Sequence, residues 1–445
     1  MTKIIFRRIY ILLGLTLILT SCRGSGVVPT PTITISTLQP SIAPEPSSTT
    51  QPTVIVLPTE TITSVPDHCS KQTILASDME LIQPELYTSK LIVYSSNSEN
   101  NSDEIYVSNW DGQKKRDITN NPASDLNPIW SPDGKRIAFQ SNRNSPLTVS
   151  CNGASDDCMY ELFIVNPDGS GLKRITKGWT FYSTWSPDGK QIAFLGAFKS
   201  DLSPYPNDPF LYDIFVVNSD GSNVQNLTKS PGFYSEPIWS PDGKKIAFHS
   251  GEMATHPDSI NIINSDGTNP SFYSDTQGNE LAWTSDGSSL LFASAPKNFS
   301  GNDIYRLKAD FSDIEQLTFT PDSHKDMIKL SPDGKWLAYH LDSSYPEDQT
   351  FCEQIRVLNT VTAQDYFVYD AEDIEQTTVD ENGTVPLYST LGFASIEWAP
   401  DSSQLLFGQY FQINMIFGDF SGAFTIQLNG TGLKHLGENG FTVQP

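Results

Sequence analysis

The sequence has few basic residues and few long hydrophobic runs. Its 445 residues include 28 Lys and Arg against 52 Asp and Glu, which gives a formal net charge of −24. Such an excess of negative charge repels phosphate backbones and argues against nucleic-acid binding. With 11% aromatic residues, 29 Gly and 30 Pro, the composition indicates many short strands joined by tight turns. A coiled coil, a multi-span membrane protein and a fully disordered chain are excluded.

Motifs of common enzymes are also missing. The sequence contains no P-loop, no H-E-x-x-H, no G-x-G-x-x-G and no G-x-S-x-G pentad. Histidine is scarce and scattered, which favours hydrogen bonding within strands over metal ligation. We therefore predict no catalytic residue, no metal and no cofactor. The six histidines are His68, His249, His256, His324, His340 and His435.

The first 21 residues have the order of an export signal. Basic residues precede an apolar run over residues 9–19, which is too short to span a membrane comfortably. The run ends in Leu-Thr-Ser followed by Cys22, which resembles a bacterial lipobox. The resemblance implies that Cys22 is acylated and becomes the new N-terminus. The expected location is the outer face of a bacterial membrane, at the cell surface or in the periplasm.

Residues 22–67 form a linker that is rich in Pro, Thr and Ser and carries almost no charge. Such a segment cannot pack a core and favours extended polyproline II conformations. We predict a stalk that lifts the folded part, residues 68–445, away from the membrane.

Four cysteines follow Cys22, and an even number in an exported protein favours disulfides. A short loop separates Cys151 from Cys158, so we predict that these two pair. That pairing leaves Cys69 for Cys352. No C-x₂-C pair supports zinc binding instead.

A repeat occupies the chain from about residue 90 onward. One unit reads W-S-P-D-G-K followed by a short apolar strand such as I-A-F. The second unit alternates with it and runs from a β-branched and aromatic strand through a polar turn to Leu-Thr. Together the two units supply four strands. The first unit begins at Trp130, Trp185, Trp239 and Trp283, and in weaker copies at Leu330 and Trp398.

These repeats resemble the WD40-like, TolB-type β-propellers, whose signature is W-S-P-D-G-K-x-I-A-F. The resemblance implies an all-β propeller of four-stranded blades. We favour seven blades, with residues 441–443 completing the first blade; six, as in the namesake of the family, is the alternative. Leu330 in place of Trp and Ser402 in place of Gly predict local changes in packing or turn.

The innermost strand of each blade ends in the Trp position and lines the mouth of the central channel, where propellers usually bind ligands. Aromatic and acidic residues there could bind a cationic peptide or a carbohydrate, or they could line a water-filled channel. We predict a non-catalytic module that binds protein, peptide or glycan, because the resemblance implies protein interaction. The alternative is a glycan-active lyase or hydrolase at the channel. The candidate residues are Asp125, Asn127, Tyr182, Tyr234, Glu236, Glu280 and Asp326.

Overall fold

The computed structural model describes the repeat region and not the N-terminal segments. Residues 1–90, which hold the predicted signal, the linker, Cys22 and Cys69, lie outside the described residues, as do Cys151, Cys158 and the side chain of Cys352. No helix among the described residues is long and apolar enough to cross a membrane. The described residues are 91–97, 102–109, 113–145, 159–197, 212–230, 232–251, 259–274, 280–294, 302–320, 323–345, 350–370, 388–413, 416–431, 433–437 and 441–443.

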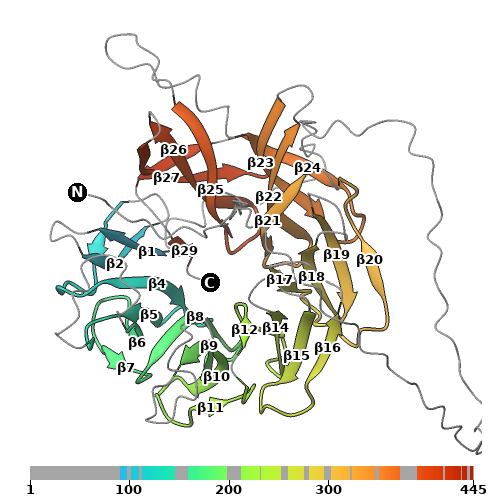
Figure 1. Ribbon diagram of the computed structural model, residues 1–445. Helices are drawn as coiled ribbons and strands as arrows, with labels where there is room; N and C mark the ends of the chain where they lie inside the picture. Colours follow the sequence, from blue (N-terminus) through green and yellow to red (C-terminus); the bar gives the residue numbers. More distant parts are fainter. Residues whose placement is uncertain are drawn as a thin grey trace, which may run out of the picture. The chain divides into compact units, whose positions relative to one another are not determined.

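These residues form seven antiparallel sheets, and each sheet is one blade (Figure 1). Blades 1 to 4 contain β1 (Leu91–Asn97), β2 (Asp103–Asn109), β3 (Arg116–Asp117), β4 (Asp125–Trp130), β5 (Ile137–Ser141), β6 (Glu161–Val165), β7 (Lys173–Arg174), β8 (Trp179–Trp185), β9 (Gln191–Ala197), β10 (Asp213–Asn218), β11 (Gln225–Asn226), β12 (Phe233–Tyr234), β13 (Ile238–Trp239), β14 (Lys245–Gly251), β15 (Ser259–Asn264) and β16 (Ser271–Ser274). Blades 5 to 7 contain β17 (Leu281–Trp283), β18 (Ser289–Ser294), β19 (Asp303–Lys308), β20 (Ile314–Gln316), β21 (His324–Leu330), β22 (Trp336–Tyr345), β23 (Thr350–Asn359), β24 (Asp365–Asp370), β25 (Tyr388–Trp398), β26 (Gln404–Ile413), β27 (Ile416–Gln427) and β28 (Lys434–Gly437). The last strand, β29 (Phe441–Val443), belongs to blade 1.

The innermost strands form a closed ring. Each lies beside the next, from β29 through β4, β8, β13, β17, β21 and β25 back to β29. The ring closes because β29 pairs with β1, with Ile92 opposite Val443 and Tyr94 opposite Phe441. Figure 1 shows β29 beside β1 near the centre of the ring. The prediction of seven blades closed by the C-terminal strand is confirmed, and closure leaves the inner edge of blade 1 paired.

The S-P-D-G segments form the turns that their residues favour. In the first copy the Gly134 amide donates to the Ser131 carbonyl at 2.8 Å, and Gly134 has φ of 63°. The Ser131 hydroxyl donates to Asp133 at 2.6 Å, which fixes the turn from inside. In blade 7, Ser402 takes the place of the glycine and still adopts φ of 65°. The turn of blade 7 therefore keeps its shape, contrary to the predicted change. The substitution instead places a residue with a Cβ in a conformation that glycine adopts more easily.

In blades 3 and 5, the threonine of the Leu-Thr ending forms hydrogen bonds within its blade. In blade 5 the Thr318 hydroxyl donates to Asp303 at 2.7 Å and accepts the amide of Ile304 at 2.9 Å. Blade 3 repeats this arrangement with Thr228, Asp213 and Ile214. The threonine thereby ties the outermost strand back to the start of the third strand of the same blade.

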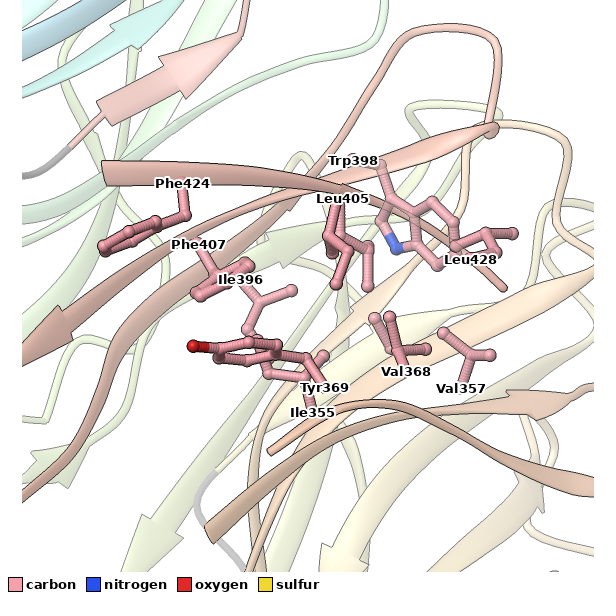
Figure 2. Packing of buried hydrophobic residues seen from close by; sticks show 12 residues of the cluster. Ile355, Val357, Val368, Tyr369, Ile396, Trp398, Leu405, Phe407, Phe424 and Leu428 are labelled. Carbon is pink, nitrogen blue, oxygen red and sulfur yellow. The ribbon is translucent and has the colours of Figure 1, made fainter. Parts of the chain in front are cut away.

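The apolar core lies between blades rather than at one centre. Figure 2 shows the packing of blade 6 against blade 7, where Trp398 lies close to Val357, Val368 and Leu428. Tyr369 and Phe407 approach to 4.9 Å between ring centroids across the same interface. Trp239 packs in the corresponding place between blades 3 and 4 and is 8% exposed. Both faces of a blade are thus buried, and the large flat indoles fill the gaps between blades.

Removal of β29 tests the closure. We expect a chain that ends at residue 440 to lose at least ~2 kcal/mol of unfolding free energy. β1 would keep β2 but lose its pairing with β29, although Ile92 and Val93 are buried. Thermal unfolding followed by circular dichroism measures the effect, and a chain that ends at Val443 is the control. Equal midpoints for the two truncated chains would show that β29 does not hold the ring closed.

Candidate functional site

The innermost strands are kinked three residues before the Trp position. Their pairing with the next strand is interrupted there in blades 2, 3 and 6. Asn127, Tyr182 and Met327 occupy the kink with φ of 51°, 47° and 55°. Such a left-handed backbone costs about 1–3 kcal/mol for a residue other than glycine and gathers at functional sites. Bulges of this kind also redirect side chains.

The equivalent positions of blades 4 and 5 carry glutamates. Glu236 lies three residues before Trp239, and Glu280 lies three residues before Trp283. Glu236 is exposed and Glu280 is half-buried. One carboxylate oxygen of Glu280 accepts the amide of Ile328 at 2.6 Å, so this side chain reaches from blade 5 to blade 6.

The amine of Lys329 in blade 6 is paired with a carboxylate of blade 7 and also feels the charge of carboxylates in blades 4 and 5. The Nζ atom of Lys329 in blade 6 lies 3.3 Å from Oε1 of Glu397 in blade 7. Glu397 raises the pKa of Lys329 most, and Glu236 and Glu280 raise it further through their charge without an ion pair to the amine. We call Glu236, Glu280, Lys329 and Glu397 the central cluster. Three carboxylates around one ammonium group leave an excess of negative charge, and 48% of the Lys329 side chain is accessible to water.

The candidates from the sequence lie in different surroundings. Glu236 and Glu280 come together, whereas Asp125 is fully buried in a salt bridge of 2.9 Å with Arg143. The Tyr234 hydroxyl donates to the Ser230 carbonyl at 2.7 Å.

Two further candidates sit at the kinks described above. Asn127 is exposed and donates to Gln140 at 2.8 Å. Tyr182 is 49% exposed.

Sequence reasoning missed Lys329 and Glu397. Both stand directly before the Trp position, in blades 6 and 7. The position of both residues before the Trp position was visible in the sequence. The kink interrupts the regular alternation of side chains, so the side to which they point was not.

Asp326 takes part in a second polar arrangement, within blade 6. The Nδ1 atom of His340 lies 2.7 Å from Asp326, and Nε2 lies 2.8 Å from Glu353. Burial opposes protonation of His340, but the hydrogen bonds to the two carboxylates and their charges raise its pKa to about 10. His340 is therefore an imidazolium at neutral pH, and it hydrogen-bonds within its blade as the sequence predicted. Among the described residues no group of three His, Cys, Asp or Glu side chains could hold a metal ion.

His249 occupies the matching position in blade 4 and behaves oppositely. Its side chain is fully buried, and this burial lowers its pKa to about 4. The Ser259 and Glu280 backbones beside the ring oppose that shift only weakly. Neither ring nitrogen of His249 has a hydrogen-bond partner among the described residues, so the predicted hydrogen bonding within the blade is wrong for this neutral core residue.

The fold and this site define a class of protein: a seven-bladed all-β propeller whose charged residues converge on the central ring. Its repeats are similar in sequence to parts of TolB homologues. The chain is 30% identical over 159 residues to a TolB homolog of Chlorobium chlorochromatii. The aligned part covers 36% of this chain and 31% of that protein. The chain is 23% identical over 223 positions to the uncharacterized peptidase YuxL of Bacillus subtilis, covering 50% and 30%.

No protein-family model matches the chain. Among solved structures, a puromycin-hydrolyzing peptidase of Mycobacterium tuberculosis superposes with a TM-score of 0.53 at 12% identity, over 79% of this chain and 54% of that one. Similarity at that level shows the fold alone. The chain spans less than half the length of the curated relatives that it matches first.

The two histidines should titrate in opposite directions. We expect the His340 ring to stay protonated from pH 6 to pH 9, and the His249 ring to stay neutral down to about pH 5. The stability that protonated His340 contributes is complete below its unfolded pKa of about 6.5 and is lost as the pH rises through 10. His249 destabilises the fold as the pH falls below 6.5 towards 4, because the unfolded state then binds the additional proton. Imidazole nitrogen shifts in NMR spectra, assigned with His340→Gln and His249→Gln, measure both values. Two ordinary titrations near pH 6.5 would contradict the arrangement.

Proposed function

We propose that the propeller is a non-catalytic module that binds a basic segment of a partner protein at the central cluster. The observation that carries this proposal is the ion pair of Lys329 with Glu397, beside which Glu280 binds the amide of Ile328 and Glu236 adds a further negative charge. The carboxylates come from separate blades, so the rigid ring fixes their positions before any ligand arrives. Prepositioned charge of one sign attracts a ligand of the other sign and orients it.

The arrangement of groups supports binding more than chemistry. The alternative is a glycan-active lyase or hydrolase, which needs a group free to exchange a proton with its substrate. Within the described part of the chain, His340 is the histidine that contacts two carboxylates, and both of its nitrogens are engaged. A raised pKa of about 10 makes it a poor base at neutral pH. A peptide and glycan array probed with the protein separates a peptide ligand from a carbohydrate.

Neutralising two glutamates tests the central cluster. In Glu236→Gln/Glu280→Gln, we expect association with a pentalysine peptide to slow by about three- to tenfold at low salt. The effect should shrink at physiological salt, where screening acts over about 8 Å. Thermal stability should change little, because the glutamine side chain that replaces Glu280 keeps an oxygen that can accept the Ile328 amide. Stopped-flow fluorescence or surface plasmon resonance at two salt concentrations measures the association rates.

The matched control removes the same charge elsewhere. Asp220 and Asp266 lie in exposed outer turns, where each accepts hydrogen bonds from its own turn. Asp220→Asn/Asp266→Asn should leave the association rate close to that of the natural protein. If both double variants slow association equally, the ligand responds to overall charge and the central cluster is not its site.

We further propose that the protein is exported and held by lipid at the outer face of a bacterial membrane. The support is the order of basic, apolar and small residues before Cys22 and the Pro/Thr/Ser-rich linker after it. Acyl chains on Cys22 would anchor the protein because each buried CH₂ contributes about 0.8 kcal/mol. The linker would then hold the propeller away from the headgroups.

Replacement of the cysteine tests the anchor. Cys22→Ala should move the protein from the membrane fraction to the soluble fraction or stop its processing. Cys22→Ser is a second variant with a similar size and no thiol to acylate. Mass spectrometry of the natural protein should show an acylated N-terminal cysteine, and an unmodified Cys22 in a mature, membrane-free protein would contradict the proposal.

A further inference from the structure

Indole side chains link the innermost strands of neighbouring blades. In four blades the indole N–H at the Trp position donates to the carbonyl of the residue just before that position in the preceding blade. Trp130, whose neighbouring strand is β29, has no such partner among the described residues. The four bonds are Trp185 to Ile129 (3.4 Å), Trp239 to Thr184 (3.3 Å), Trp283 to Ile238 (3.3 Å) and Trp398 to Lys329 (2.8 Å).

Blade 6 breaks this pattern. Leu330 stands at its Trp position and has no side-chain N–H, so blade 6 makes no such bond to the Ala282 carbonyl of blade 5. Leu330, Leu281, Ala282 and Trp283 line an open hollow of about 450 Å³ at this place. The hollow is open to solvent and not an enclosed cavity. The hollow continues along the prolines of the neighbouring S-P-D turns to Trp239.

The hollow borders the central cluster. Glu280 directly precedes Leu281, and Lys329 directly precedes Leu330. The same two innermost strands therefore carry the apolar recess and two members of the central cluster. The combination is complementary to a large apolar side chain with basic residues next to it.

We infer that this hollow is the subsite for a tryptophan side chain from the basic segment that the central cluster binds. The inference rests on the proposed function and names the residue that the partner inserts. The protein's own repeat is the model for the contact, because four indoles already fill the equivalent place and donate to the equivalent carbonyl. A leucine or phenylalanine of the partner would fill the apolar space but leave the Ala282 carbonyl without that donor. A second copy of this chain is a poor occupant, since two molecules of net charge −24 repel each other.

Three synthetic peptides, titrated calorimetrically into the full-length protein at low salt, test the inference. Each peptide has one lysine on either side of a central residue, and the central residue is tryptophan, 1-methyltryptophan or leucine. We expect the tryptophan peptide to bind at least ~tenfold more tightly than the leucine peptide, because an aromatic side chain buries a large area in the recess. The 1-methyl peptide should bind more weakly than the tryptophan peptide, because it has no N–H to donate. Equal affinities for tryptophan and leucine would overturn the inference.

Filling the hollow from within is the second test. Leu330→Trp should place an indole where the other blades have one, remove the preference for the tryptophan peptide and leave the melting temperature equal or higher. Leu330→Met, which keeps the recess open, is the matched control and should retain the preference. If Leu330→Trp lowers the melting temperature, the recess does not fit an indole and the inference is wrong.

The proposed function and the subsite fail in different ways. If Glu236→Gln/Glu280→Gln weakens all three peptides while Leu330→Trp changes nothing, the central cluster binds basic peptides and the tryptophan subsite is refuted. If neither variant changes the affinity of any peptide, the proposed function fails and the subsite fails with it.

Discussion

The structure depends on the burial of both faces of every blade. A single four-stranded sheet of this sequence would expose two apolar faces to water, and only the neighbouring blades can cover them. Trp239 between blades 3 and 4 and Trp398 between blades 6 and 7 show the form this takes. In the closed ring every one of the seven sheets has a neighbour on each side. The ring also brings the innermost strands together, which is the reason that charged residues distant in the sequence share one site.

The local features could be predicted from the sequence because they depend on a few adjacent residues. The S-P-D-G turns, the four strands of each blade and the completion of blade 1 by residues 441–443 all follow from repeats visible in one chain. Convergence across blades could not be predicted in the same way. Lys329 pairs with Glu397 of blade 7 and feels the charge of glutamates in blades 4 and 5. Such contacts depend on the ring geometry and not on any motif.

Blade 6 departs from the repeat in several respects at once. Besides Leu330 and the engaged His340, it buries Lys325 completely against Asp303 of blade 5, with 3.1 Å between the charged atoms. The amine also donates to the Asn302 carbonyl and to Ser323. Burying an ion pair stabilises little by itself, because removing two charges from water is costly.

The pairing of β1 with β29 has a kinetic consequence. Ile92 and Val443 lie near opposite ends of the folded region, so their contact spans almost the whole propeller sequence. Contacts of such long sequence separation form slowly, because the loop between them must first be ordered. During synthesis or export from the N-terminal side, blade 1 has to wait for its innermost strand until the last residues emerge. Until then the nascent chain carries an unpaired strand edge at β1, where a chaperone or an identical chain could add a strand.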